Sequence, residues 1–324
     1  MTSGTSPDRS DYDVLVVGGG AAGLSAGVAL SRARRRVLVI DAGSPRNAPA
    51  GGVHNFLTRD GLAPAELQRL GAAEVIRYGG EVVPATATSA APEAGGFRVE
   101  TSIGSITARR LVLASGLVDE LPDIAGLRER WGRDVLHCPY CHGFEVSDQA
   151  IGILASGPTA GHQALLFTQW SRDIVLFQHT APVLGEEDLE RLAARGVRIV
   201  QGEVAEILTT DDHLSGVRLV DGSTVERQAV VVGPRFTASS PVLDSLGVSA
   251  QPLLVENTTI GASYPANPQG RTSVPGVYVA GNVTDLMAQV VTSAAAGLMV
   301  GSVVNMDLLL ADAAEDVARF RAAR

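Results

Sequence analysis

Short apolar runs rich in β-branched residues recur along the chain, and stretches of small residues separate them. Near the N-terminus, Val14–Val17 and Val37–Ile40 flank a stretch rich in alanine and glycine. The β-branched runs predict strands, and the longer stretch between them predicts a helix that crosses from one strand to the next. This part of the chain therefore predicts a strand–helix–strand unit with parallel strands.

The same pattern returns in the middle of the chain, where residues 151–178 align with residues 13–41. Gln178 lies 18 residues beyond Ala160, just as Asp41 lies 18 residues beyond Gly23. A repeated strand–helix–strand unit indicates an α/β fold with two Rossmann-like nucleotide-binding domains.

The other segments complete this frame. Residues 81–110 predict a small β-meander, and residues 109–116 a strand that ends in a small-residue turn. Residues 276–297 predict a strand, a turn and a long helix. We expect residues 11–117 and 240–324 to form one domain, with residues 118–239 inserted as a second domain.

The turn of the first unit carries the dinucleotide-binding fingerprint G-x-G-x-x-G at Gly18, Gly20 and Gly23. Gly18 permits the tight turn, Gly20 lets a pyrophosphate approach the backbone, and Gly23 lets the helix pack closely on the strand. Asp41 ends the second strand, where an acid binds a ribose hydroxyl. The glycines alone would be weak evidence, but the strand, helix and acid around them indicate a bound nucleotide.

The corresponding turn of the second unit has lost this chemistry. Ala155 adds a side chain at the tight turn, and Pro158 removes a backbone N–H, although proline suits the first position of a helix. Gln178 replaces the acid, and no arginine follows it to hold the 2′-phosphate of NADP. We therefore expect a nucleotide-binding architecture without its nucleotide.

Composition narrows the function classes. The net charge of −9 argues against binding to nucleic acid or to an anionic membrane surface. The N-terminus lacks the basic segment of a signal peptide, and the apolar stretch 290–310 contains Ser, Thr, Asn and Asp, which favours a buried helix over a membrane span. The run Arg34–Arg36 is most simply a solvated loop. We expect a cytoplasmic protein, in which structural disulfides are rare.

Cys138 and Cys141 are the only cysteines, and they lie in the segment HCPYCHGFE. Covalent haem attachment uses a CxxCH pattern but normally requires export. Zinc needs four ligands; His137 and His142 are available, but adjacent residues rarely converge on one ion, and the chain has no second CxxC. A redox-active disulfide fits best, because a helical turn between the cysteines brings the sulfurs together and a helix start favours the thiolate.

Three neighbours of the cysteines suit this chemistry. Pro139 fits the first position of a helix that begins at the motif. His142 can act as a general base or stabilise a thiolate, because imidazole titrates near neutrality. Glu145 can share a helical face with His142 and orient it. The alternatives are a surface histidine and a solvated glutamate without a catalytic role.

The segments VVGGGAAG, ASG followed by LPDIAG, CPYC, VVGP and SVPGVYVAGNVTD resemble, in order and over nearly the whole chain, the low-molecular-weight thioredoxin reductases. The resemblance implies FAD on the first fingerprint, NADPH on the second, a redox disulfide in the inserted domain, and a homodimer. The family's AGD motif appears here with Asn282 in place of the acid, a change that still allows a hydrogen bond to the flavin ribityl chain. Besides the fingerprint glycines and Asp41, the implied FAD-binding residues are Ala21, Ala22, Asn55, Gly116, Gly281, Asn282, Gln289 and Val290.

Two departures from this family change the expected activity. The second fingerprint is degraded, and His142 stands where the family has an acid after its second cysteine. With CPYCHG, an aromatic residue and Glu145 in succession, the chain is similar to the dithiol oxidases of gliotoxin, holomycin and romidepsin biosynthesis. Those enzymes close a disulfide within a small natural product and return the electrons to oxygen.

This resemblance implies an FAD-dependent enzyme that oxidises a small dithiol and uses O2 but neither metal nor pyridine nucleotide. Substrate would attack Cys138, His142 would deprotonate the second substrate thiol, and Cys141 would lie nearest the flavin. Two alternatives stay open. One is an NAD(P)H-dependent reductase of a thioredoxin-like protein, which needs a working second site. The other is a flavin-binding redox sensor without turnover.

Overall fold

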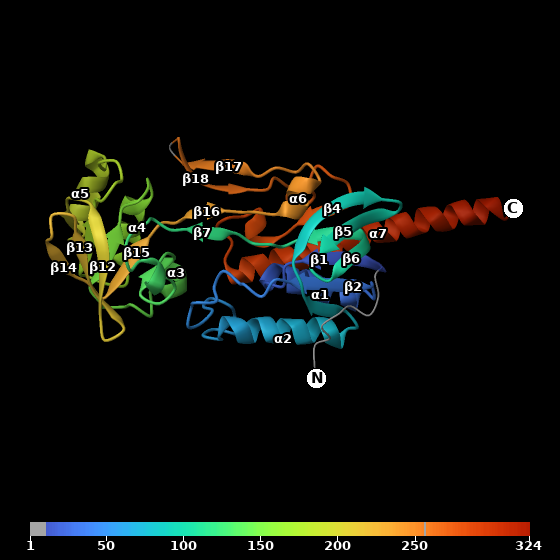
Figure 1. Ribbon diagram of the computed structural model, residues 1–324, viewed down its shortest axis with the longest axis horizontal. Coiled ribbons are helices and arrows are strands. Elements are labelled where there is room, and N and C mark those ends of the chain that lie inside the picture. Colours follow the sequence, from blue (N-terminus) through green and yellow to red (C-terminus); the bar gives the residue numbers. More distant parts are fainter. Residues whose placement is uncertain (1–10, 256) are drawn as a thin grey trace.

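The computed structural model describes residues 11–255 and 257–324. Figure 1 shows an elongated molecule with two parts side by side. One part contains residues from both ends of the chain, and the other contains the middle of the chain. The fold is mixed α/β, as the sequence predicted.

The first part is built on a seven-stranded sheet. Its parallel region contains β3, β2, β1, β6 and β19, and β4 and β5 continue it as an antiparallel meander with β6, which confirms that prediction. The strands are β1 (Asp11–Val17), β2 (Val37–Asp41), β3 (Glu81–Pro84), β4 (Ala87–Glu93), β5 (Gly96–Thr101), β6 (Gly104–Leu113) and β19 (Val277–Val279).

Alternate residues of the central strands enter two different cores, because successive side chains of a strand point to opposite faces. Val14 and Val16 of β1 face α1 (Ala21–Arg32), α2 (Pro64–Arg77) and α7 (Val290–Ala322). Leu15 of β1, with Leu38 and Ile40 of β2, faces the opposite core. That core is covered by α6 (Pro241–Ser245) and by residues of a four-stranded sheet, β17 (Gln251–Val255), β18 (Thr258–Ser263), β16 (Arg235–Thr237) and β7 (Val118–Glu120).

The second part contains a five-stranded parallel sheet between α-helices and a small antiparallel sheet. Its unit β9–α4–β10 repeats β1–α1–β2, which confirms the predicted repeat. The elements are η1 (Arg128–Arg130), β8 (Val135–Leu136), α3 (Pro139–His142), β9 (Ile151–Leu154), α4 (Ala160–Phe167), β10 (Ile174–Phe177), α5 (Glu186–Ala194), β11 (Arg198–Val200), β12 (Val204–Thr210), β13 (His213–Leu219), β14 (Thr224–Glu226) and β15 (Ala229–Val232).

The chain passes between the two parts along β7 and β16, which pair with each other in antiparallel orientation. β16 also pairs with β18, so the two strands extend the sheet of β17 and β18. The predicted boundaries assigned both strands to the inserted domain. In the structure β16 pairs with β18, which follows residue 240, and β7 pairs with β16, so the domain boundaries stay a prediction.

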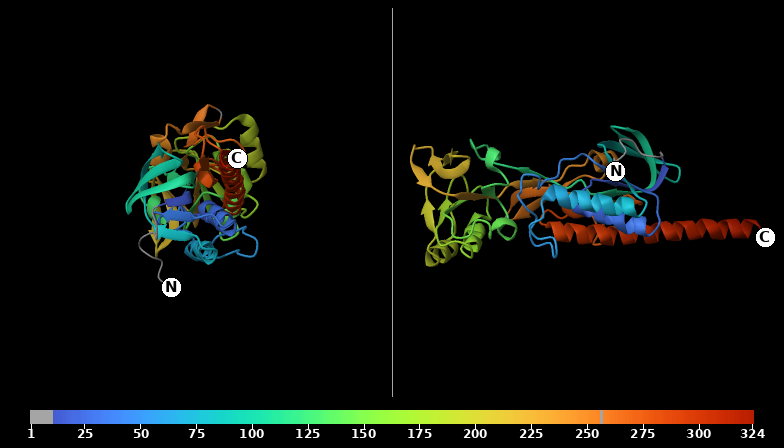
Figure 2. Two further views of the ribbon diagram at one scale, coloured as in Figure 1. Left: turned by 90° about the vertical axis from the view of Figure 1, so that its right-hand side faces the viewer. Right: turned by 90° about the horizontal axis from the view of Figure 1, so that it is seen from below.

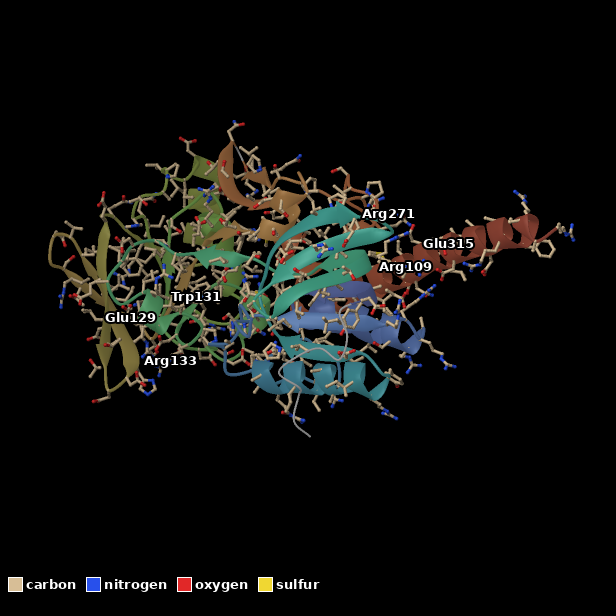
Figure 3. All side chains as sticks on the ribbon, turned by 45° about the vertical axis from the view of Figure 1, so that its right-hand side comes forward. Arg109, Glu129, Trp131, Arg133, Arg271 and Glu315 are labelled. Atoms are coloured by element: carbon tan, nitrogen blue, oxygen red, sulfur yellow. The ribbon has the colours of Figure 1, made fainter. Side chains whose placement is uncertain are left out.

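Helix α7 is buried along one face only. Gly297 lets it approach α1, because a Cβ at this position would lie 2.0 Å from the carbonyl oxygen of Ala22. By length and composition α7 could cross a membrane, with a mean hydropathy of 1.7 over its most apolar window, but core helices of soluble proteins pass the same test. Only 28% of that window is buried, so the expectation of a buried helix is wrong for the outer face. The helix runs past the sheet and projects into solvent, with Glu315 on the projecting part (Figures 2 and 3).

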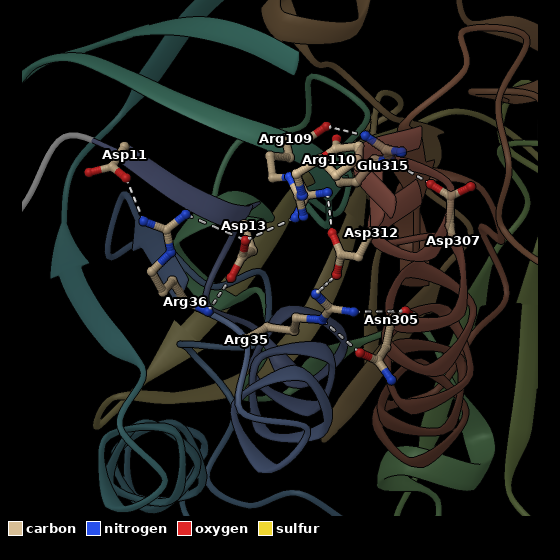
Figure 4. Close-up of polar contacts among 11 residues, drawn as sticks. Asp11, Asp13, Arg35, Arg36, Arg109, Arg110, Asn305, Asp307, Asp312 and Glu315 are labelled. Carbon is tan, nitrogen blue, oxygen red and sulfur yellow. Dashed lines mark hydrogen bonds and ion pairs between the residues drawn. The ribbon is translucent and has the colours of Figure 1, made fainter. Parts of the chain in front are cut away.

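A polar network fixes the middle of α7 to the sheet (Figure 4). Arg35 donates to Asn305 and Asp312 at 2.9 and 2.7 Å, and Arg109 donates to Asp312 at 2.5 Å. Arg110 contacts Asp307 at 2.5 Å. Arg35 therefore does not belong to a solvated loop, contrary to the prediction from the sequence.

Candidate active site

A cavity of about 1140 Å3 lies between the two parts of the molecule. It brings together the first fingerprint, the CxxC segment and the degraded second fingerprint, so the three motifs share one space. Its lining includes Gly18, Gly20, Asp41 and Gly116 from the first part, and Cys138, Cys141, His142 and Gly157 from the second.

The first fingerprint has the geometry that dinucleotide binding requires. Gly18 has φ of +107°, and a Cβ there would lie 2.3 Å from the carbonyl oxygen of Ala114. A Cβ on Gly23 would lie 1.8 Å from the carbonyl oxygen of Gly18, whereas Gly20 has open space around it. Helix α1 begins directly after Gly20, so its N-terminal N–H groups point to the place of a pyrophosphate.

Asp41 lies at the carboxyl end of β2, on the wall of the same cavity. Its carboxylate accepts hydrogen bonds from the Gly19 N–H at 3.0 Å and from Nε2 of Gln68 at 2.5 Å. These contacts hold the carboxylate where it can accept a hydrogen bond from a ribose hydroxyl. Glycine cradle, helix N-terminus and acid together fit FAD.

The other predicted cofactor residues divide into three groups. Ala21, Ala22, Gly116, Asn282, Gln289 and Val290 line the cavity. Gly281 instead packs against α1 and α7, since a Cβ there would meet Ala22 at 2.9 Å. Asn55 is absent from the described lining, and its Nδ2 donates to the carbonyl oxygen of Tyr140. Its contact with FAD stays a prediction, and its observed contact is with the CxxC segment.

Asn282 has one side-chain atom left for a cofactor. Its Nδ2 donates to the carbonyl oxygens of Asp285 and Ala288, both at 2.9 Å, and so holds the turn that precedes α7. A ribityl hydroxyl can therefore donate only to Oδ1 of this residue.

The CxxC segment forms the short helix α3, with Cys138 as its N-cap and Pro139 at its first position. A hydrogen bond from the Cys141 thiol, assisted by the N–H groups of Cys141 and Tyr140 and opposed by burial, lowers the pKa of Cys138 to about 7. The same hydrogen bond, together with burial, raises the pKa of Cys141. Of the two thiols, Cys138 is therefore the one that ionises first, while Cys141 keeps its proton.

Helix α3 ends at His142, and Glu145 belongs to the following turn, from which its charge acts on His142. Burial lowers the pKa of His142, while the charge of Glu145 raises it and the charge of His54 lowers it. The imidazole is therefore neutral and able to accept a proton near neutral pH.

The sequence interpretation did not assign a role to three residues near the cysteines. Arg46 donates two hydrogen bonds to Asp119, both at 2.7 Å, and its charge lowers the pKa of both cysteine thiols. His137 contacts the carbonyl oxygen of Val232 through Nδ1 at 3.2 Å, and burial lowers its pKa. In the sequence, the only signals for a role were that Arg46 lies close to the fingerprint acid Asp41 and that His137 directly precedes Cys138.

The second fingerprint no longer presents a helix N-terminus at the corresponding position. Helix α4 begins at Ala160 rather than directly after Gly157, and Thr159 is its N-cap. Pro158 thus lies in a turn before the helix and not at the first helical position, although proline would suit that position. Ala155 is not among the residues with positive φ, unlike its counterpart Gly18.

The side chain that replaces the acid in the second unit is hydrogen-bonded to the protein's own backbone. The side chain of Gln178 is buried, and its Nε2 donates to the carbonyl oxygens of Ala181 and Pro182 at 2.9 and 2.8 Å. Nδ1 of the next residue, His179, accepts from the N–H of Val204 at 3.0 Å. Nε2 of Gln178 and Nδ1 of His179 are therefore engaged by the chain itself, and neither residue supplies the carboxylate that Asp41 supplies in the first unit. Among residues 11–255 and 257–324, no three His, Cys, Asp or Glu side chains are grouped as metal ligands.

Comparison with known proteins gives consistent matches over nearly the whole chain. Residues 12–297 match the family described as pyridine nucleotide-disulphide oxidoreductase. The chain is 32% identical to thioredoxin reductase sirT of Leptosphaeria maculans, over 94% of this chain and 97% of that protein. It is 29% identical to thioredoxin reductase tcpT of Claviceps purpurea, over 92% and 94%.

Solved structures also match this chain over nearly its whole length. The crystal structure of HlmI is 42% identical in sequence, with a TM-score of 0.89 over 99% of this chain and 100% of that one. The structure of an oxidoreductase from Agrobacterium tumefaciens is 35% identical, with a TM-score of 0.86 over 93% and 99%.

Proposed function

Because this chain belongs to the pyridine nucleotide-disulphide oxidoreductase family, we propose that it is a dithiol oxidase that closes an intramolecular disulfide in a small molecule and gives H2O2 from O2. It is a thioredoxin-reductase-like flavoenzyme with FAD as cofactor. The proposal adds two points to this: electrons flow from the substrate through FAD to O2, and the substrate is a small molecule rather than a protein.

One contrast carries this proposal. The first fingerprint keeps an intact glycine turn and its acid, whereas the second has a displaced helix start and a glutamine bonded to its own turn. A reductase that takes electrons from NADPH needs both sites, and an oxidase that takes them from a dithiol needs only the first. The cysteines share their cavity with both, so a small substrate can reach them there.

In the oxidised enzyme, a substrate thiolate attacks Sγ of Cys138, which breaks the Cys138–Cys141 bond and forms a mixed disulfide. His142 takes the proton of the second substrate thiol. The resulting thiolate attacks the substrate sulfur bound to Cys138, so the product disulfide forms and Cys138 leaves as a thiolate. A leaving thiol of low pKa speeds this exchange, and the lowered pKa of Cys138 supports its role.

The two electrons of the substrate then reside on the Cys138–Cys141 pair. FAD, when bound, supplies an acceptor for them and a path to O2. For each turnover, two S–H bonds break, one S–S bond forms, and two electrons and two protons convert O2 to H2O2. Arg46 lies near enough to both cysteines to favour their thiolate forms during the exchange.

Anaerobic reduction of the purified flavoprotein tests this proposal. We expect neither NADPH nor NADH to bleach the visible flavin band, and we expect dithiothreitol, as a small dithiol, to bleach it. Air should then restore the colour with one H2O2 per dithiol consumed. The double variant Cys138→Ser/Cys141→Ser should bind FAD but resist bleaching by the dithiol.

Other results would support one of the alternatives. Rapid bleaching by NADPH contradicts the oxidase proposal and supports a reductase that acts on a protein disulfide. Reduction by dithiol without repeated turnover in air supports a redox sensor.

We also propose that the enzyme is a homodimer, that it works in the cytoplasm, and that its substrate belongs to natural-product biosynthesis or self-resistance. The dimer is supported by the outer face of α7, where large apolar side chains are exposed. They are Leu298, Met299, Met306, Leu309, Leu310, Val317 and Phe320.

A further inference from the structure

A loop of the first part, residues 53–62, lies against the CxxC segment of the second. Its ends are joined by a hydrogen bond from the Val53 N–H to the Leu62 carbonyl oxygen at 2.8 Å. Within the loop, the Asn55 N–H donates to Oδ1 of Asp60 at 2.9 Å. The side chain of Asn55 reaches across to the carbonyl oxygen of Tyr140. The loop is therefore braced internally and docked next to the cysteines.

His54, in this loop, lies between two carboxylates. Its Nε2 is 3.3 Å from Oε1 of Glu145, and its Nδ1 is 3.4 Å from Oδ2 of Asp60. An imidazole that faces an acceptor with each nitrogen can take a proton on one side and release one on the other. Glu145 belongs to the second part of the molecule and Asp60 to the first, so the ring bridges the two.

These groups lie between the cavity and solvent, with Glu145, His54 and Asp60 in direct contact and His142 within the reach of their charges. His142 is half-buried at the cavity wall, and the charges of Glu145 and His54 both act on it. The side chain of Glu145 is 41% exposed and that of Asp60 is 68% exposed. Acidic and basic groups alternate along the series: His142, Glu145, His54 and Asp60.

We propose that His54 is a positioning residue of the thiol-oxidising site, which holds Glu145 beside His142 and gives the thiol proton a path to solvent. This inference rests on the proposed oxidase function. His142 takes the proton from substrate sulfur and passes it to Glu145. Nε2 of His54 accepts it while Nδ1 releases a proton to Asp60, so charge is conserved at each transfer and no electrons move. The proton path from His142 to solvent is therefore complete only when the loop is docked on the CxxC segment.

The test measures the anaerobic rate of flavin bleaching by dithiothreitol in His54→Gln between pH 6 and pH 9. Gln can hold Glu145 but cannot pass on a proton. We expect FAD content and Tm to match wild type and the rate near pH 6.5 to fall roughly tenfold, less than the ~10²–10⁴ contributed by a general base itself. The deficit should vanish near pH 9, above the pKa of about 8.5 of a free thiol, because the dithiol then ionises without help.

The matched control is His213→Gln, which changes an exposed histidine on the far sheet of the second part and should leave the profile unchanged. A second measurement uses His54→Gly with added imidazole, which should restore the rate at pH 6.5. A deficit that is equal at all pH values, or no rescue by imidazole, overturns the inference. If dithiothreitol fails to bleach the wild-type flavin at any pH, the proposed function itself is wrong.

Discussion

Cys138 and Cys141 occupy different positions on α3, and their thiols differ for that reason. Cys138 is the N-cap and receives hydrogen bonds from the Cys141 thiol and from backbone N–H groups, whereas Cys141 donates. A thiolate forms as pH rises through the pKa of its thiol. We therefore expect iodoacetamide to alkylate Cys138 of the reduced protein with a midpoint near pH 7.

Substitution of Cys141 checks the cause of this shift. Cys141→Ala removes the main hydrogen bond to Cys138 and should move the alkylation midpoint upward, whereas Cys141→Ser keeps a donor and should move it less. Mass spectrometry of the alkylated peptide across pH gives both midpoints. Equal midpoints in the two variants would assign the shift to the helix N-terminus and Arg46 instead.

His142 sets the acid limit of activity. Because burial lowers its pKa, the neutral base persists below the ordinary imidazole value of about 6.5. The acid limb of kcat/KM for a dithiol should therefore lie on the acid side of that value. His142→Gln should lower kcat/KM at neutral pH by ~10²–10⁴ and remove this limb. An unchanged limb in His142→Gln would transfer the role of base to another group, with His137 the nearest candidate in the chain.

Interpretation of single residues reaches only chemistry that is local in sequence. Cys138, Cys141 and His142 were predicted because spacing and adjacency carry the information. The contact of Glu145 with His54 joins the two parts of the molecule, and the pair formed by Arg46 and Asp119 joins residues 73 positions apart in the sequence. Only the fold brings these residues together, so no local pattern could predict them.

At the scale of elements, two units with the same spacing differ in how their helices begin. The sequence predicted the repeat, but not that α4 starts two residues later than the alignment with α1 implies. Pro158 lacks an N–H and restricts the residue before it, and this favours a turn over the first helical turn. A change in helix start removes the N–H groups that hold a phosphate while the strands and their pairing persist.

The first unit allows a matched pair of substitutions. Gly18→Ala places a Cβ 2.3 Å from a backbone carbonyl oxygen at φ of +107°, whereas Gly20→Ala meets nothing within 4 Å in the protein. We expect Gly18→Ala to lower the Tm of the FAD-free protein, since a left-handed backbone alone costs about 1–2 kcal/mol. Gly20→Ala should keep that Tm and lose FAD affinity, because its methyl group enters the cavity.

Thermal unfolding without FAD and a flavin-fluorescence titration separate the two effects. Normal FAD affinity in Gly20→Ala would mean that the pyrophosphate does not approach this turn. A normal Tm in Gly18→Ala would mean that the turn can relax, so the tight contact would not be required for the fold.

At the scale of the whole molecule, α7 links distant parts of the chain. Its inner face packs on α1, and Asp307 and Asp312 bind arginines of β6 and of the loop before β2. The sequence predicted a long apolar helix but could not show which of its faces is covered. That depends on partners far away in the chain, and small residues such as Gly297 have no periodic signal of their own.

The last prediction concerns the outer face of α7. Met299, Met306, Leu310, Val317 and Phe320 are spaced by three, four or seven residues and form an exposed stripe that continues onto the projecting end of the helix. An isolated helical segment is only marginally stable in water, and a large exposed apolar surface marks an interaction site. A second copy of the chain would cover the stripe on both helices at once.

We therefore expect light scattering to give a dimer for the wild-type holoenzyme and a monomer for Leu310→Glu at micromolar concentration. Two leucines lost across a twofold axis, at about 1.5–3 kcal/mol each, weaken association by roughly 10²–10⁴-fold. Glu315→Gln is the matched control, since it changes charge on the same projecting helix without adding a charge to the stripe, and it should stay dimeric. A wild-type monomer, or a dimer of Leu310→Glu with full affinity, would show that another surface, or none, joins two copies.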